Sequence, residues 1–316
     1  MAFELSRRTF LKSGSLAAAG LALPWWACRS MPRPDFTAAF LTDMHVDGRN
    51  QAPEGWKKSL VSAMGQPVKP DFVITGGDLA YDCLHKGTVE EADAQYALFN
   101  AAVNEVVDVP IYHTIGNHDC LGVYNDSGMS PDDEWFGKRN FLKRFNRDKT
   151  HLSFQHNGWT FALLDTVNTD NRDYKGEVDA EQIKWLEAEL GSTSNPAVVV
   201  GHIPLFSNYH ETEKGNSVVD HPKETVHNAN DVVKAFDGKK VRLMLAGHLH
   251  INESWTFRGT EYANIGAVSG SWWRGPRDGF QEGYAMLEFY GDQARWSYVD
   301  YNWDPPPEAM ERAQKS

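Results

Sequence analysis

Seven side chains that could bind metal ions lie in five short segments, and each segment follows an apolar run. Four imidazoles, two carboxylates and one amide oxygen form a donor set that suits iron, manganese or zinc. A cage for calcium would consist of oxygen ligands and would not need four histidines. We therefore expect a transition-metal centre built from Asp43, His45, Asp78, Asn117, His202, His248 and His250.

The apolar runs before these side chains have the length of buried β-strands. They span residues 36–41, 72–74, 109–115, 197–200 and 241–246, and glycine precedes the ligand in four of the five loops that follow. Residues 90–107 and 179–190 have helical spacing, and Asp179 with Gln182 forms a capping-box pattern at the second of these helices. Because ligands of open α/β sheets gather at the carboxyl ends of strands, the five loops are expected to converge on one crevice.

Antiparallel strands are expected in two further regions. Asn157-Gly158 lies between apolar residues 152–156 and 159–164, which predicts a hairpin. After His250 the helical patterns stop, and strand-like runs at 261–265, 284–289 and 294–298 are expected to close a second sheet. The predicted organisation is one domain at residues 29–303, with a β-rich portion at about 255–303 and a flexible tail at 304–316.

The ordered motifs Asp-x-His, Gly-Asp, Gly-Asn-His-Asp, Gly-His and Gly-His-x-His resemble those of the calcineurin-like metallophosphoesterase superfamily over about residues 35–300. The resemblance implies an α/β fold in which two mixed β-sheets form a sandwich flanked by helices. It also implies two metal ions, with a hydroxide between them that attacks the phosphorus of a phosphoester. One ion would be held by Asp43, His45, Asp78 and His250, and the other by Asp78, Asn117, His202 and His248, so that Asp78 bridges them.

His118 and Tyr81 receive roles from the same resemblance. In the superfamily the histidine after the motif asparagine helps to protonate the leaving oxygen, and Asp119 or a backbone carbonyl would orient His118 for this step. Tyr81 stands where purple acid phosphatases have an iron-binding tyrosine, although those enzymes lack the histidine that corresponds to His45. Two interpretations of Tyr81 stay open: a partner outside the ligand set, which we favour, or a further iron ligand.

The N-terminal residues differ in character from the rest. Arg7 and Arg8 precede a Gly/Ala-rich apolar run at residues 16–23 that is too short to span a bilayer. This pattern is typical of a leader for the twin-arginine export machinery, so residues 1–28 are expected to be a signal peptide. The mature protein would be periplasmic or lie at the outer face of the cytoplasmic membrane. Cys28 could carry a lipid anchor, although the residues before it fit simple cleavage better.

Cys83 and Cys120 are the cysteines that remain after the leader, and each follows a predicted metal loop. In an oxidising compartment they could pair. Two unrelated buried thiols would be equally consistent with the sequence.

Charge and composition limit the class of substrate that the protein is expected to bind. The formal net charge is −12 and no Lys/Arg cluster occurs beyond the first dozen residues, which disfavours long nucleic acid. We therefore predict an exported hydrolase that acts on small phosphate monoesters or diesters, with iron, manganese or zinc in its two sites. His210 and Arg274 are candidate substrate-binding residues, and Trp272 could stack on a leaving group. The alternatives are a non-catalytic exported metal-binding protein and an acid phosphatase of the purple-acid-phosphatase type.

Overall fold

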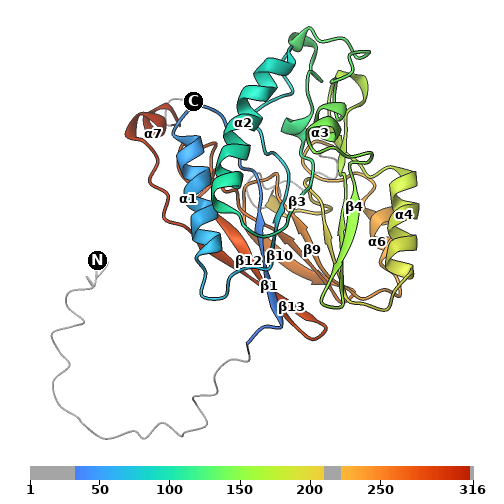
Figure 1. The fold of residues 1–316 in the computed structure, drawn as a ribbon. Helices are drawn as coiled ribbons and strands as arrows, with labels where there is room; N and C mark the ends of the chain where they lie inside the picture. The colour runs from blue at the N-terminus through green and yellow to red at the C-terminus, as the bar shows by residue number, and fades with distance from the viewer. Residues whose placement is uncertain (1–32, 210–221, 314–316) are drawn as a thin grey trace, which may run out of the picture. The chain divides into compact units, whose positions relative to one another are not determined.

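Two large β-sheets form the centre of the computed structural model, which describes residues 33–209 and 222–313. In that part of the chain the first sheet has the strand order β13-β12-β1-β2-β3, and the second has the order β10-β11-β9-β8-β5-β4. β6 (Val167–Asn168) and β7 (Lys175–Gly176) form a separate small ribbon. Helices flank the two large sheets (Figure 1), which confirms the predicted sandwich of mixed sheets.

The first sheet combines parallel and antiparallel pairs. β1 (Phe36–Leu41), β2 (Phe72–Thr75) and β3 (Ile111–His113) run parallel. β12 (Gly283–Tyr290) is antiparallel both to β1 and to β13 (Gln293–Asp300). The last two strands of the domain therefore extend the first sheet, and the expectation that they close the second sheet is wrong.

The second sheet contains the predicted hairpin. β4 (Leu152–His156) and β5 (Trp159–Leu163) pair antiparallel across the Asn-Gly turn. β5, β8 (Ala197–Val200) and β9 (Val241–Ala246) run parallel. β11 (Thr260–Asn264) pairs with β9, and β10 (Glu253–Phe257) pairs with β11 at the edge of the sheet.

The core between the sheets is made by alternate strand residues. Phe40 and Ile74 from the first sheet belong to the same buried cluster as Leu163, Val200 and Leu245 from the second. Their immediate neighbours along each strand point to the opposite face, because successive side chains of a strand alternate. These neighbours are also buried, so both faces of each sheet are covered.

Helices cover the outer faces of the sheets. α1 (Ala52–Met64) and α2 (Val89–Val106) pack together beside the first sheet, and α4 (Ala180–Gly191) and α6 (Ala229–Ala235) pack together beside the second (Figure 1). Two shorter helices are α3 (Arg139–Arg144) and α7 (Pro307–Ala313), and α7 lies in the segment expected to be a flexible tail. In residues 33–209 and 222–313, no helix has both the length and the apolar character needed to cross a membrane.

The start of α4 follows the predicted cap in part. The Asp179 side chain accepts a hydrogen bond of 2.9 Å from the backbone N–H of Gln182. The Gln182 side chain does not complete a capping box, because it exchanges two hydrogen bonds with the backbone of Asp165. Gln182 thus ties α4 to the end of β5 and not to its own first turn.

The two cysteines of the domain are not joined. Cys83 and Cys120 are both buried, free thiols, and burial raises the pKa of each well above its ordinary value. Of the two alternatives left open by the sequence, the structure has the pair of separate buried thiols.

Candidate metal centre

The loops that carry the predicted ligands lie at the carboxyl ends of parallel strands. β1, β2 and β3 run parallel in the first sheet, and β8 and β9 run parallel in the second. Their loops supply Asp43, His45, Asp78, Asn117, His202, His248 and His250. His248 is half-buried and the other six are buried. The structure therefore brings all seven side chains to one place.

The backbone of these loops is held in an uncommon conformation. Positive φ angles are rare for residues that have a Cβ, and they persist only where the surrounding structure fixes them. Such angles occur at Asp43 (56°), His45 (42°), Asp78 (54°), His248 (70°) and His250 (60°). The fold thus accepts local strain where it presents these side chains.

Gly247 shows how closely the loops from the two sheets approach each other. A Cβ at this position would lie 2.0 Å from Thr42 Oγ1 and 2.3 Å from Asp43 Oδ2. Thr42 Oγ1 itself donates a hydrogen bond of 2.6 Å to Asp43 Oδ2, so the carboxylate cannot turn away without losing it. Only glycine leaves room for this packing.

We expect Gly247→Ala to displace Asp43, to weaken metal binding about 10- to 100-fold and to destabilise the fold by about 1–3 kcal/mol. Metal titration and thermal denaturation measure the two effects. Gly48→Ala is the matched control, because a Cβ at Gly48 meets nothing within 4 Å. Metal affinity equal to that of the unsubstituted protein would contradict the close approach described here.

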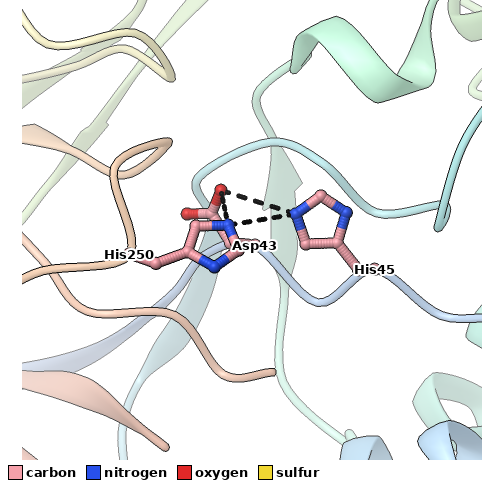
Figure 2. Close-up of side chains that lie close together, drawn as sticks. All are labelled: Asp43, His45 and His250. Carbon is pink, nitrogen blue, oxygen red and sulfur yellow. Dashed lines mark hydrogen bonds and ion pairs between the residues drawn. The ribbon is translucent and has the colours of Figure 1, made fainter. Parts of the chain in front are cut away.

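The first group of donor atoms comprises Asp43, His45 and His250 (Figure 2). Asp43 Oδ1 lies 3.2 Å from His250 Nε2 and 3.9 Å from His45 Nε2. The two Nε2 atoms are 3.2 Å apart. These separations are those expected between neighbouring ligands of one ion, since Zn–N and Zn–O bonds are about 2.0–2.2 Å long.

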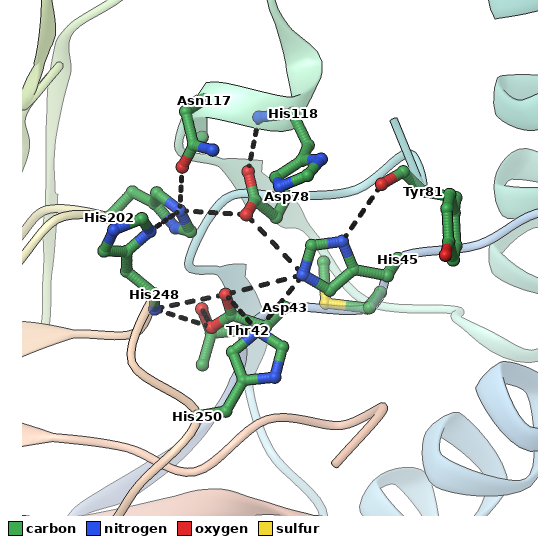
Figure 3. Close-up of polar contacts among 12 residues, drawn as sticks. Thr42, Asp43, His45, Asp78, Tyr81, Asn117, His118, His202, His248 and His250 are labelled. Carbon is green, nitrogen blue, oxygen red and sulfur yellow. Dashed lines mark hydrogen bonds and ion pairs between the residues drawn. The ribbon is translucent and has the colours of Figure 1, made fainter. Parts of the chain in front are cut away.

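The second group comprises Asp78, Asn117, His202 and His248 (Figure 3). His202 Nε2 lies 3.1 Å from Asp78 Oδ2, 3.0 Å from Asn117 Oδ1 and 3.2 Å from His248 Nδ1. Asp78 Oδ2 is also 3.6 Å from His45 Nε2 in the first group. Asp78 therefore lies between the two groups, where the resemblance places a bridging carboxylate.

Backbone carbonyls fix the orientation of all four rings. A carbonyl oxygen only accepts hydrogen bonds, so the ring nitrogen that faces it carries the proton. Nδ1 of His45, His202 and His250 donates to Tyr81 O, Gly76 O and Gly270 O, and Nε2 of His248 donates to Lys223 O. The remaining nitrogen of each neutral ring therefore directs a lone pair towards the centre.

These lone pairs decide whether the site fits two ions. Nε2 of His45 faces Nε2 of His250 at 3.2 Å, and Nε2 of His202 faces Nδ1 of His248 at 3.2 Å. Two acceptors at such a distance repel each other unless a cation or a proton lies between them. Asn117 Nδ2, moreover, is buried without a hydrogen-bond partner, whereas Asn117 Oδ1 points into the site. The donor set fits two transition-metal ions held by nitrogen and oxygen.

The protonation of His45 and His248 agrees with this fit. Burial lowers the pKa of His45 to about 3 and that of His248 to about 4, so both rings are neutral and able to bind metal at pH 7. Burial also acts to lower the pKa of His202, but the negative charge of Asp78 outweighs it and raises that pKa to about 9. Without an ion, His202 therefore keeps a proton, which metal binding must release.

The Asp119 side chain links the loops after β2 and β3 through hydrogen bonds. Its carboxylate is buried, and the carboxylate that pairs with the His118 ring is that of Asp82, so the expectation that Asp119 or a backbone carbonyl orients this ring stays a prediction. The Asp119 carboxylate accepts hydrogen bonds from the backbone N–H groups of Asp78, Leu79, Ala80 and Gly116 and from the hydroxyl of Tyr96. One carboxylate thereby fixes the loops after β2 and β3 relative to each other.

His118 lies at the open side of the centre. Its backbone N–H donates a hydrogen bond of 2.8 Å to Asp78 Oδ1, and its ring stands edge-on to that of His45 at 4.8 Å. The carboxylate that faces its Nδ1 is Asp82, at 3.7 Å. Burial acts to lower the pKa of His118, but Asp78 and Asp82 outweigh it and raise the pKa. The ring thus has a carboxylate behind it and is half-buried.

Comparison with known proteins agrees with this geometry. The profile of the family described as "Calcineurin-like phosphoesterase" matches residues 36–252, which is more than half of the chain. The chain belongs to the calcineurin-like phosphoesterase family. The matched region begins at β1 and ends just after His250, so it contains all five loops that carry the predicted ligands.

Relatives of this phosphoesterase include enzymes and one anchoring protein. A probable cyclic nucleotide phosphodiesterase from Xenorhabdus bovienii is 23% identical over 232 residues, which cover 70% of this chain and 79% of that protein. A dimetal phosphatase from Danio rerio has a TM-score of 0.59 at 14% identity, with 86% of this chain and 98% of that chain covered. GAP50, the anchor in the inner membrane complex of Plasmodium, has a TM-score of 0.51 at 13% identity, with 84% and 85% covered.

The two solved structures establish the shared fold. The family match and the X. bovienii relative identify this chain as a metal-dependent phosphoester hydrolase.

Tyr81 contacts the phosphoesterase centre through its backbone. Its carbonyl oxygen accepts the hydrogen bond from His45 Nδ1 at 3.2 Å. The centroid of its ring is 6.3 Å from that of His45, and the guanidinium of Arg49 lies 3.9 Å above the phenol ring. This arrangement is consistent with Tyr81 as a partner that orients the predicted ligand His45, and the choice between the two interpretations stays a prediction.

A cavity of about 190 Å³ is lined by four of the predicted metal ligands, namely His45, Asp78, His248 and His250. Its walls also include His118. Trp272, which the sequence suggested could stack on a leaving group, also forms part of the wall, and the remaining wall residues had no role in the sequence analysis, namely Tyr174, Tyr209, Glu224, Leu249 and Arg277. Of the two candidate substrate-binding residues, Arg274 bonds to Ser271 O and is not part of this wall, and His210 lies outside the described residues.

Asp82 is the functional candidate that sequence reasoning missed. It follows Tyr81 directly and lies four residues after Asp78, but it has no strand or helix pattern around it. The position of the Asp78 motif was the one signal that could have drawn attention to Asp82. Its proximity to His118 depends on the packing of two loops from different strands.

Proposed function

We propose that this phosphoesterase is an exported enzyme that hydrolyses small phosphate monoesters or diesters at its dinuclear metal centre. The observation that carries the proposal is the convergence of four imidazole lone pairs, two carboxylates and an amide oxygen beneath a cavity that also contains His118. A protein that used the scaffold only for binding would not need a proton donor on the open side of the ions. The proposal therefore favours catalysis over the non-catalytic alternative.

Different residues are proposed to have different roles in the reaction. Two ions, when bound, supply Lewis-acid stabilisation of the phosphoryl oxygens and an attacking hydroxide at neutral pH. Asp78 holds the two halves of the site together, because its Oδ2 atom faces both His45 and His202. His118 lines the cavity and is proposed to protonate the leaving oxygen, while Asp82 keeps its ring oriented.

The substrate range rests on the cavity and on the relatives. A volume of about 190 Å³ suits a small ester. The X. bovienii relative is a probable cyclic nucleotide phosphodiesterase and the D. rerio protein is a dimetal phosphatase, so both diesters and monoesters stay within the proposal. The net charge of −12 and the absence of basic clusters from the domain sequence argue against long nucleic acid.

Metal removal tests the proposed function. Chelation of the purified protein is expected to lower turnover of p-nitrophenyl phosphate and bis-p-nitrophenyl phosphate by more than about 10³-fold, and added Mn²⁺ or Fe²⁺ to restore it. Steady-state rates at matched protein concentration measure both changes. If the metal-loaded protein hydrolysed neither these esters nor cyclic nucleotides, the proposal would be wrong.

We further propose iron or manganese in at least one of the two sites. Four nitrogen and three oxygen donors accept either metal, and a protein exported in the folded state could take up its ions before it meets competing zinc or copper. Elemental analysis of protein processed in its own host should then find iron or manganese near one equivalent per chain. Zinc alone in both sites would contradict the proposal.

Export itself rests on residues 1–28, which lie outside the described residues. The paired arginines Arg7 and Arg8 support a twin-arginine leader and a periplasmic location, or attachment to the outer face of the cytoplasmic membrane through Cys28. Replacing both arginines by lysine is expected to retain the protein in the cytoplasm. Fractionation of cells measures this, and unchanged export would exclude the twin-arginine route.

A further inference from the structure

Two adjacent tryptophans in the loop after β11 have unusual backbone angles. Trp272 and Trp273 have φ angles of 51° and 64°, a region that bulky side chains rarely occupy. Such a conformation persists only where surrounding contacts fix it. The two side chains have different environments, since Trp273 is buried and Trp272 is half-buried.

Trp273 is the contact that fixes the loop. Its indole N–H donates to the backbone carbonyls of Met44 and His45 at 2.9 Å and 3.0 Å. Its ring also occupies the space beside Gly55 of α1, where a Cβ would come within 2.2 Å of it. The loop is therefore anchored to the same segment that carries the first metal-binding residues.

The anchoring of Trp273 places its neighbour beside two of the predicted metal ligands. The ring centroid of Trp272 lies 4.7 Å from that of His250 and 5.4 Å from that of His45. Trp272 also lines the cavity above the metal-binding side chains. One part of the indole thus backs the first metal site, and another part forms the cavity wall.

The cation near Trp272 is already compensated. Arg277 Cζ is 5.7 Å from the Trp272 ring centroid, within the range of about 6 Å for a cation–π contact, so the guanidinium stands over the indole. Arg277 Nε bonds to Asp278 Oδ2 at 3.0 Å, and the Tyr209 hydroxyl donates to the same oxygen at 2.5 Å. With its charge paired in this way, Arg277 is better suited to lie flat over a ring than to attract a second phosphate.

We propose that Trp272, with Arg277 above it, binds a planar ring in the organic part of the ester, such as a nucleobase or an aryl group. The inference rests on the proposed function, because the metal centre must hold the phosphate. Three of the cavity's wall residues are aromatic, namely Tyr174, Tyr209 and Trp272. Aromatic faces stabilise bound planar rings whatever hydrogen-bond donors and acceptors those rings carry. Glycerol or ethanolamine has no ring and would gain little binding energy from such faces.

Pairs of substrates that differ only in the base test the inference. Adenosine 3′,5′-cyclic monophosphate and base-free ribose 3′,5′-cyclic phosphate share the reacting bond, as do AMP and ribose 5-phosphate. The unsubstituted enzyme should favour the base-bearing member by about 5- to 150-fold in kcat/KM. Trp272→Leu should bring this ratio close to one, and Trp272→Phe should retain most of it because the ring remains. Damage to the metal centre would lower both rates and leave the ratio unchanged.

Binding provides a second readout and a control. Titration calorimetry with AMP and ribose 5-phosphate should show the same loss of discrimination in Trp272→Leu, independently of turnover. Trp255→Leu is the matched control, because Trp255 lies on β10 against Tyr262 and outside the cavity wall. A ratio near one in the unsubstituted enzyme, or a ratio that Trp272→Leu does not change, would overturn this inference. Loss of all phosphoester hydrolysis in the metal-loaded, unsubstituted enzyme would overturn the proposed function itself.

Discussion

Asp78→Asn is expected to lower kcat/KM for phosphoester hydrolysis by at least about 10³-fold and to reduce the bound metal from two ions per chain to one or none. Asp78 Oδ2 lies 3.6 Å from His45 Nε2 and 3.1 Å from His202 Nε2, so it is the one carboxylate atom shared by the two donor groups. Asparagine has the same size but removes the charge that offsets two cations. Steady-state kinetics and elemental analysis of the same preparation measure both effects.

The matched control for this substitution is Asp47→Asn. Asp47 is also a buried carboxylate, four residues after Asp43, but it pairs with Arg49 and belongs to neither donor group. We expect the Asp47→Asn protein to keep both ions and a turnover within a few-fold of normal, because Asp47 contacts Arg49 and none of the predicted ligands. If Asp78→Asn also kept two ions and normal turnover, the bridging position of Asp78 would be wrong.

The sequence was informative at the strand ends for a physical reason. Each ligand loop follows a short apolar run of the length that favours a buried strand, and at β1 and β9 the observed bounds match the predicted runs. Glycine before the ligand marks a close approach of loops, and the space at Gly247 shows such an approach. Both signals are local, so they were visible before the fold was known.

The helix α1 could not be predicted because tertiary contacts override its local sequence. It begins after Gln51 in the left-handed region, without a side-chain cap, and Gly55 in its first turn disfavours a helix. The reason for that glycine is Trp273, whose ring lies where a Cβ would be. Trp273, more than two hundred positions further along the chain, thus explains why position 55 is a glycine. No periodicity within the α1 sequence could show this reason.

The cavity wall was hidden for a similar reason. Tyr174, Glu224 and Arg277 come from irregular segments, and nothing in their spacing indicates that they meet above the metal centre. Arg274 had the same claim as Arg277 in the sequence, since both are arginines in one Gly-rich loop. The anchoring of Trp273 decides between them, because it fixes which part of the loop faces the cavity.

His118→Ala is expected to separate chemistry from metal binding. The ring of His118 lines the cavity and lies close to His45 and Asp78, but it is not one of the seven predicted ligands, so we expect both ions to remain bound. Removing a general acid lowers kcat about 10²- to 10³-fold when the leaving group is an alkoxide that must be protonated. A p-nitrophenolate leaving group needs no proton, so its kcat should fall much less. The measurement is the ratio of the two losses, with metal content determined on the same samples.

The difference between leaving groups is what identifies the role of His118. If His118 only shaped the cavity, or only positioned Asp78 through its backbone N–H, then His118→Ala would lower the kcat for alkyl and nitrophenyl esters by similar factors. His85→Ala is the control, because this exposed histidine of the neighbouring loop pairs with Asp126 and should leave both rates unchanged. Asp82→Asn should reproduce the His118→Ala pattern more weakly, about 10-fold, because it removes the carboxylate behind the ring but not the proton donor. Equal losses for the two esters in His118→Ala would assign the leaving-group proton to another donor.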